Sequence, residues 1–135
     1  MIVVDVNVIV HLLTDTDRHP LAMRIYGQEQ QWRVPPLWRH EMLNILATMT
    51  RNDVLDGRSA GTLWHNALGL FTPREQQPAM DQALEIAIEH GISAYDAQYV
   101  TLAMGLDTLL VSEDRKLQQR LPHRVLSMAA FAADD

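Results

Sequence analysis

The chain has 135 residues, no cysteine and a formal net charge of −6. A hydrophobic content of 47% excludes a disordered body, and the absence of cysteine excludes disulfide and zinc–thiolate sites. The acidic balance argues against a broad basic surface for nucleic acid, although a bound metal ion would supply positive charge locally.

The sequence predicts neither a membrane span nor a signal peptide. No apolar stretch has the length that a bilayer requires, and Asp5 interrupts the apolar run at an N-terminus that lacks basic residues. We therefore expect a cytoplasmic protein, and the lack of cysteine fits a reducing compartment. No internal repeat or linker is visible, and the length suits a single domain over residues 1–135.

The first stretch, Ile2 to Val10, is rich in β-branched residues and contains Asp5 and Asn7. This pattern predicts a short buried strand that ends near Asp5, followed by a helix to Leu13 that either Asp5 or Asn7 caps. Ligands of open parallel sheets bind outside the carboxyl ends of the strands. Asp5 is therefore the first candidate site residue.

A helix from Pro20 to about Gln31 and a short strand at residues 32–34 should follow. The next helix is marked by an apolar stripe: Trp38, Met42, Ile45, Leu46 and Met49. Glu41 lies at the margin of that stripe. An ordinary solvated acid is the simpler interpretation of this helix alone, and a site residue is the alternative.

Two further helices are predicted before residue 91. The first runs from Asp56 to Phe71, and a polar loop over residues 72–78 separates it from the second. The second has a regular stripe that consists of Met80, Ala83, Leu84, Ala87 and Ile88. Glu85 and Glu89 lie off this stripe and should be solvated, and Gly91 is a good helix stop.

Asp96 has two competing interpretations. Ser93 and Asp96 have the spacing of a capping box with Asp in place of Glu. Asp96 also shares the helical spacing of Tyr99, Val100 and Ala103, which places a carboxylate at the head of an inward face. We favour the second interpretation, in which Asp96 is a functional acid.

The C-terminal part repeats the arrangement of the first stretch. Residues 109–111 read as a buried strand, and a short helix from Arg115 to Leu121 follows with Ser112 as its expected cap. If the two strands are parallel, Asp5 and Asp114 reach the same edge of the sheet. A last strand at residues 125–127, a helix at 128–133 and an acidic end, Asp134-Asp135, complete the chain.

Four acids are thus singled out, in four successive motifs: Val4-Asp5-Val6-Asn7, Arg39-His40-Glu41, Tyr95-Asp96-Ala97 and Ser112-Glu113-Asp114-Arg115-Lys116-Leu117. In this order the motifs resemble those of the PIN domain, and the likeness is closest to the toxin ribonucleases of VapBC toxin–antitoxin pairs. It extends over essentially the whole chain.

The resemblance implies a three-layer α/β/α fold with a small central parallel sheet surrounded by helices. It also implies an endoribonuclease that cleaves RNA with Mg²⁺ or Mn²⁺, a small VapB-like antitoxin as partner, and a homodimer. Carried over to this sequence, the catalytic and metal-binding acids are Asp5, Glu41, Asp96 and Asp114. Asn7 and Ser112 are supporting polar residues, and Ser112 stands where the family often has Thr.

Carboxylates suit this chemistry because Mg²⁺ prefers hard oxygen ligands and neutralises the charge of a phosphodiester. The six histidines show no paired metal spacing, and the three tryptophans fall on or near apolar faces. Two alternatives stay open. One is an aspartate-based phosphatase or receiver-type domain, for which Lys116 is the only lysine. The other is a PIN-like interaction module without catalysis.

Overall fold

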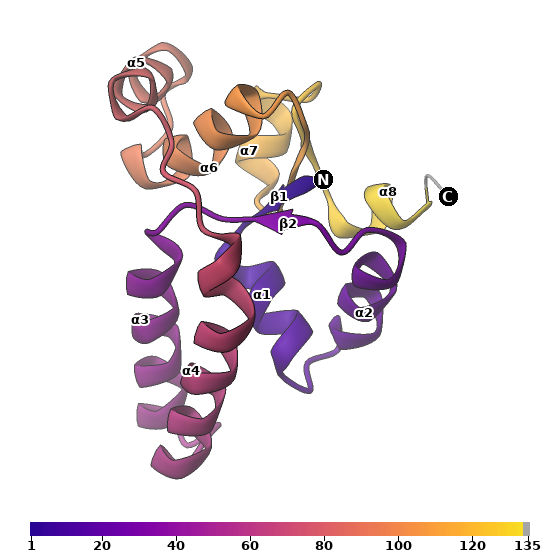
Figure 1. Cartoon of the computed structure of the whole chain (residues 1–135), viewed down its shortest axis with the longest axis vertical. Helices are drawn as coiled ribbons and strands as arrows, with labels where there is room; N and C mark the ends of the chain where they lie inside the picture. Colours follow the sequence, from indigo (N-terminus) through magenta and orange to yellow (C-terminus); the bar gives the residue numbers. More distant parts are fainter. Residues whose placement is uncertain (134–135) are drawn as a thin grey trace.

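The computed structural model describes residues 1–133, and in it a parallel sheet lies between two layers of helices (Figure 1). This confirms the predicted three-layer α/β/α fold with a small central parallel sheet. The strands are β1 (Ile2–Val4), β2 (Trp32–Arg33), β3 (Leu110–Val111) and β4 (Val125–Leu126). The predicted acidic end, Asp134-Asp135, lies outside the described residues.

Eight α-helices and one short 3₁₀ turn connect these strands within the described residues. In chain order they are α1 (Val6–Leu13), α2 (His19–Gln28), α3 (Trp38–Arg51), α4 (Gly57–Phe71), the 3₁₀ turn η1 (Thr72–Arg74), α5 (Met80–His90), α6 (Ala94–Gly105), α7 (Arg115–Arg120) and α8 (Met128–Ala133). None of the helices in residues 1–133 is both long and apolar enough to cross a membrane.

Strand β1 lies inside the sheet, whose order is β2-β1-β3-β4. Val3 pairs with Arg33 on one side and with Leu110 on the other, and every pairing is parallel. The residues that follow β1 and β3 therefore reach the same edge of the sheet, as the sequence predicted for Asp5 and Asp114.

The side chains of β1 alternate between two apolar clusters, as a strand's period of two requires. Ile2 and Val4 pack in the cluster that contains α1 to α4 and α8, whereas Val3 packs with α6 and α7 on the other face. Because all three are buried, β1 reads in the sequence as a continuous apolar run.

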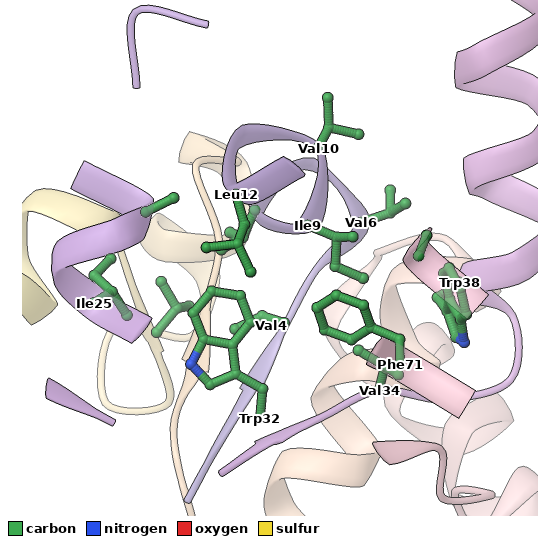
Figure 2. Close-up of a cluster of buried hydrophobic side chains, with 14 of the residues drawn as sticks. Val4, Val6, Ile9, Val10, Leu12, Ile25, Trp32, Val34, Trp38 and Phe71 are labelled. Atoms are coloured by element: carbon green, nitrogen blue, oxygen red, sulfur yellow. The ribbon is translucent and has the colours of Figure 1, made fainter. Parts of the chain in front are cut away.

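Aromatic rings fill the first cluster (Figure 2). The ring of Phe71, at the end of α4, lies 6.2 Å from that of Trp32 and 5.7 Å from that of Trp38, measured between centroids. Trp32 and Trp38 are fully buried, so these two tryptophans belong to the core, as predicted. Together they pack α3 and α4 against β2.

Several element boundaries differ from the prediction by one residue, and one boundary and one cap differ for a visible structural reason. Helix α2 ends at Gln28, three residues early, because the backbone is extended at Glu29 and the Gln31 carbonyl accepts a hydrogen bond from Ile2 N–H at 3.0 Å. Pairing with β1 thus takes precedence over helical periodicity. At α7 the cap is Asp114 rather than Ser112, and its Oδ1 accepts from the Leu117 N–H at 3.1 Å.

Helix α5 departs most from its predicted packing. It lies at the periphery of the molecule, next to α6 (Figure 1). Ala83 is buried, but Met80, Leu84 and Ile88 are 48%, 60% and 74% exposed. Glu85 and Glu89 are exposed as expected, and Gly91 ends the helix in the left-handed region at φ 63°. The helix was predicted correctly, but half of its apolar stripe faces outward.

Candidate active site at the carboxyl edge of the sheet

Asp5 follows β1 directly and is held by two elements. As the cap of α1, it accepts a hydrogen bond at Oδ1 from the Val8 N–H at 3.2 Å, whereas Asn7 is an exposed residue of the first turn. Its Oδ2 accepts a hydrogen bond from the Ser112 hydroxyl. The pKa of the Asp5 carboxyl is raised to about 6, mainly by burial; the charge of Glu41 also raises it, whereas these two hydrogen bonds lower it.

Ser112 joins the ends of β1 and β3. Its side chain is completely buried, donates to Asp5 and accepts a hydrogen bond from the Asp114 N–H at 3.1 Å. Asp114 itself is exposed. One hydroxyl therefore fixes the Asp5 carboxylate and the backbone from which Asp114 projects.

Glu41 stands in the first turn of α3 and is half-buried. The hydroxyl of Tyr99, on α6, donates a hydrogen bond to its Oε1 at 2.6 Å. Burial raises the pKa of the Glu41 carboxyl, the hydrogen bond from Tyr99 lowers it, and the charge of Asp96 raises it. Glu41 is thus a held, partly desolvated acid rather than an ordinary solvated one.

Asp96 lies in the first turn of α6, next to the cap residue Ser93, and also lies near other acids. Ser93 accepts a hydrogen bond from the Asp96 N–H at 3.0 Å, which is one half of the predicted capping box. Burial raises the pKa of the Asp96 carboxyl, and so does the charge of Asp114. The hydrogen bond with Ser93 and the charge of Lys116 lower this pKa.

The four acids therefore form a row in which each one perturbs the next. Glu41 acts on Asp5, Asp96 acts on Glu41, and Asp114 acts on Asp96. Within residues 1–133, no three Asp, Glu, His or Cys side chains are grouped closely enough to surround one metal ion. The row is an electrostatic neighbourhood of like charges, and its role in binding metal stays a prediction.

Tyr99 is the residue of this neighbourhood that the sequence interpretation missed. It is only 3% exposed, and its burial, followed by the charges of Glu41, Asp5 and Asp96, raises the pKa of its hydroxyl far above the ordinary tyrosine range. The helical pattern placed Tyr99 correctly on the inward face of α6. The available signal was the phenolic hydroxyl on that face, which requires a polar partner when it is buried.

Comparison with known proteins identifies the family. The family model of the PIN domain matches residues 2–122. The chain belongs to the PIN domain family. Its family is therefore not that of receiver-type domains, which was one of the two alternatives.

This PIN domain is similar to two curated proteins of Pyrobaculum aerophilum. It is 27% identical to ribonuclease VapC3 over 124 residues, which cover 90% of this chain and 95% of the relative. It is 38% identical to exonuclease VapC9 over 78 residues, which cover 58% of each protein.

Two solved structures share the fold. PAE2754 from Pyrobaculum aerophilum aligns with a TM-score of 0.78 and 20% identity, covering 98% of this PIN domain and 94% of the other chain. FitAcB from Neisseria gonorrhoeae aligns with a TM-score of 0.70 and 19% identity, covering 96% and 99%. The same sheet and helices thus occur in proteins of very different sequence.

Proposed function

We propose that this PIN domain is a metal-dependent endoribonuclease that hydrolyses RNA phosphodiester bonds. The observation that carries the proposal is the row of four acids at the carboxyl edge of the sheet, with raised pKa values at three of them. Similarity to ribonuclease VapC3 over 90% of the chain supports RNA as the substrate.

The residues of this edge fit Mg²⁺ or Mn²⁺ by the chemistry of their donors. All four offer hard carboxylate oxygens. Burial, and after it the charge of a neighbouring acid, raises the pKa of Asp5, Glu41 and Asp96, and a bound cation relieves both effects. Mg²⁺ needs only one or two direct carboxylates because it keeps several waters, so a tight group of three acids is not required. Asp5, Glu41, Asp96 and Asp114 would hold the ion between them.

The protein's own contribution is to fix these oxygens. Ser112 holds Asp5, and Tyr99 holds Glu41 through Oε1, which leaves Oε2 available as a ligand. When bound, the ion supplies positive charge to the phosphate and lowers the pKa of water. Asn7, an exposed residue two positions after Asp5, is the proposed supporting polar residue of the first motif.

Cleavage assays test the proposal directly. Purified protein should cut RNA in Mg²⁺ or Mn²⁺ and stop when EDTA is added. Equal cleavage with and without the chelator would refute a metal-dependent mechanism. No cleavage and no response of thermal stability to either ion would instead support the interaction module without catalysis.

The resemblance to VapC proteins adds a biological role, that of the toxin in a toxin–antitoxin pair. A chain that cuts cellular RNA has to be restrained, and a small VapB-like antitoxin is the expected partner. An Arg of that partner would replace the metal's charge and pair bidentately with the carboxylates. Expression without any partner should arrest growth, whereas unaffected growth would contradict the toxin role.

We also expect a homodimer, by analogy with the family. The outward apolar side chains of α5, Met80, Leu84 and Ile88, are available to bury on such a contact. Light scattering should give twice the mass of the chain, and a strict monomer at high concentration would exclude the dimer.

A further inference from the structure

A pocket of about 350 Å³ opens beside the row of acids. It lies between the first half of α3 and the start of α6, and its lining side chains are Leu37, His40, Glu41, Asn44 and Tyr95. We propose that this pocket binds one base of a single-stranded RNA next to the bond that is cleaved. The proposal rests on the ribonuclease function proposed above and adds the recognition of a base to it.

The position of Glu41 carries the first step. Glu41 is both a wall of the pocket and a member of the acid row, and Tyr95 directly precedes Asp96 on α6. A base is joined to its phosphate through a single ribose. A base held in this pocket therefore keeps its own phosphate within reach of the acids.

The chemistry of the lining carries the second step. Tyr95 is 63% exposed, although an aromatic ring of this size is usually covered, and it presents a face on which a base can stack. Asn44 and His40 are exposed polar side chains from successive turns of α3. Within residues 1–133, neither of them nor the Tyr95 hydroxyl has a hydrogen-bond partner, so all three are available to base edges. Single-stranded RNA is read in this way, by stacking and edge contacts.

The other groove on α3 lacks these properties. It has about 460 Å³, lies between α3 and α4, and is lined mainly by apolar residues such as Leu46, Ala47 and Trp64. It contains no acid and no residue of α6. Of these two pockets, the one beside Glu41 is the one that adjoins the acid row, and it adds the exposed ring of Tyr95 and the polar side chains of His40 and Asn44.

The test compares two strands with equal phosphate charge. One is a fluorescein-labelled single-stranded RNA of mixed sequence, and the other is an abasic ribose–phosphate strand of the same length. Fluorescence anisotropy in Ca²⁺ measures the dissociation constant of each strand, because Ca²⁺ accepts the same oxygen ligands as Mg²⁺. The wild-type protein should bind the strand with bases about tenfold more tightly, which is the size of one stacking contact.

Variants of Tyr95 decide whether this pocket is the cause. Tyr95→Ala should bind both strands equally, whereas Tyr95→Phe, which keeps the ring, should retain most of the preference. Met23→Ala is the matched control because it truncates an exposed side chain, 49% exposed, outside the pocket. In Mn²⁺ the KM of Tyr95→Ala for RNA should rise about tenfold while kcat changes little.

The outcomes separate this proposal from the proposed function. A wild-type protein that cuts RNA in Mn²⁺, together with a Tyr95→Ala variant that still prefers the strand with bases, refutes the base pocket alone. A wild-type protein that binds neither strand also refutes the pocket. A wild-type protein that cuts no RNA with either ion overturns the nuclease function, and the pocket with it.

Discussion

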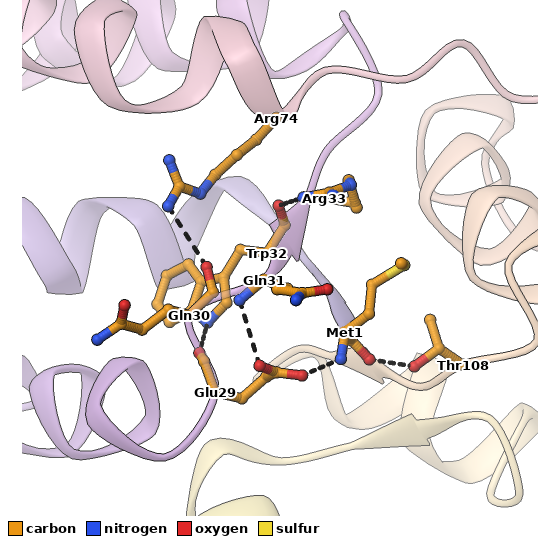
Figure 3. A network of polar contacts seen from close by, with 8 residues as sticks. All are labelled: Met1, Glu29, Gln30, Gln31, Trp32, Arg33, Arg74 and Thr108. Carbon is orange, nitrogen blue, oxygen red and sulfur yellow. Dashed lines mark hydrogen bonds and ion pairs between the residues drawn. The ribbon is translucent and has the colours of Figure 1, made fainter.

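The amino and carboxyl edges of the sheet differ in how their polar and charged groups are paired. Before the strands begin, polar groups are compensated by opposite partners (Figure 3). The Met1 ammonium pairs with Glu29, the Thr108 hydroxyl donates to the Met1 carbonyl, and the Arg74 guanidinium donates to the Gln30 carbonyl at 3.4 Å. Beyond the strands lie four acids, and the charge of a neighbouring acid raises the pKa of three of them, Asp5, Glu41 and Asp96.

Because all strands are parallel, the residues that precede the strands lie at one edge of the sheet and the residues that follow them lie at the other. At the amino end the gathered groups satisfy one another and tie the starts of β1, β2 and β3 together. At the carboxyl end the gathered groups repel one another, and this opposes folding. The difference teaches that stabilising contacts are concentrated at the amino end, whereas the carboxyl end carries the like charges from which a binding site is proposed above.

The largest effect should come from Asp96→Asn. The change keeps the shape and the Ser93 cap but removes one charge, so RNA cleavage should fall by orders of magnitude. The metal-free variant should be as stable as the wild type, or more stable by on the order of 1 kcal/mol. Mg²⁺ should raise the melting temperature of the wild type by mass action and that of the variant much less.

Thermal melts with and without Mg²⁺, beside one cleavage assay, check this prediction. A variant that melts lower in EDTA yet cuts RNA normally would show that Asp96 is only a helix cap.

The second effect concerns pH in the metal-free protein. The raised pKa of Asp5, about 6 against an ordinary 3.8, means that the folded state holds a proton that the unfolded state has lost. This contribution to stability is complete well below pH 4 and disappears as pH rises through about 6; its size is about 3 kcal/mol. Urea unfolding of wild type and Asp5→Asn in EDTA should show a difference that changes across this window. A difference that is constant from pH 4 to pH 8 contradicts the prediction.

A smaller effect should follow from Tyr99→Phe. It removes only the hydroxyl that holds Glu41, so the affinity for Mn²⁺, measured by calorimetry, should fall about tenfold. In the Glu41→Gln background the same change should have almost no effect on metal binding, because the group through which it acts is altered.

Tyr26→Phe is the matched control, since its hydroxyl accepts a hydrogen bond from Arg74 at 3.0 Å, away from the acids. Equal losses of affinity for Tyr99→Phe in both backgrounds would show that Tyr99 does not act through Glu41.

The smallest effect is expected at the amino end. Glu29→Gln removes an acid, as Asp96→Asn does, but this acid is partly exposed and paired with the Met1 ammonium. The free energy of unfolding should fall by about 0.5 kcal/mol, and the loss should shrink at high salt. Urea unfolding at two salt concentrations measures it. An increase in the stability of Glu29→Gln would contradict the prediction that the acid at the amino edge is stabilising.

The sequence was sufficient for the scaffold and for part of the edge. A buried strand, followed directly by an acid and then by a helix, predicted where Asp5 and Asp114 lie. The residue that follows each parallel strand is placed at the carboxyl edge of the sheet. The inward face of α6 likewise predicted the half-buried position of Asp96. The assignment of these acids to a metal remains a prediction.

What could not be predicted depends on contacts between distant segments. Glu41 was ambiguous on its own helix because its partner, Tyr99, lies 58 residues further along the chain. The cap of α7 is Asp114 rather than Ser112 because the helix begins at Arg115, directly after Asp114, while the Ser112 hydroxyl accepts from the Asp114 N–H. The apolar stripe of α5 predicted which face of the helix is apolar. It did not predict that only part of that face would be buried against α6.

The interior place of β1 has a consequence for the order of events during synthesis. Val3 pairs with Leu110, and Asp5 receives its hydrogen bond from a serine 107 residues later. During synthesis, the edge of β1 that pairs with β3 therefore stays unpaired until most of the chain has left the ribosome. Asp5 therefore lacks its Ser112 partner until β3 has been synthesised, and the carboxyl edge of the sheet is completed only after most of the chain.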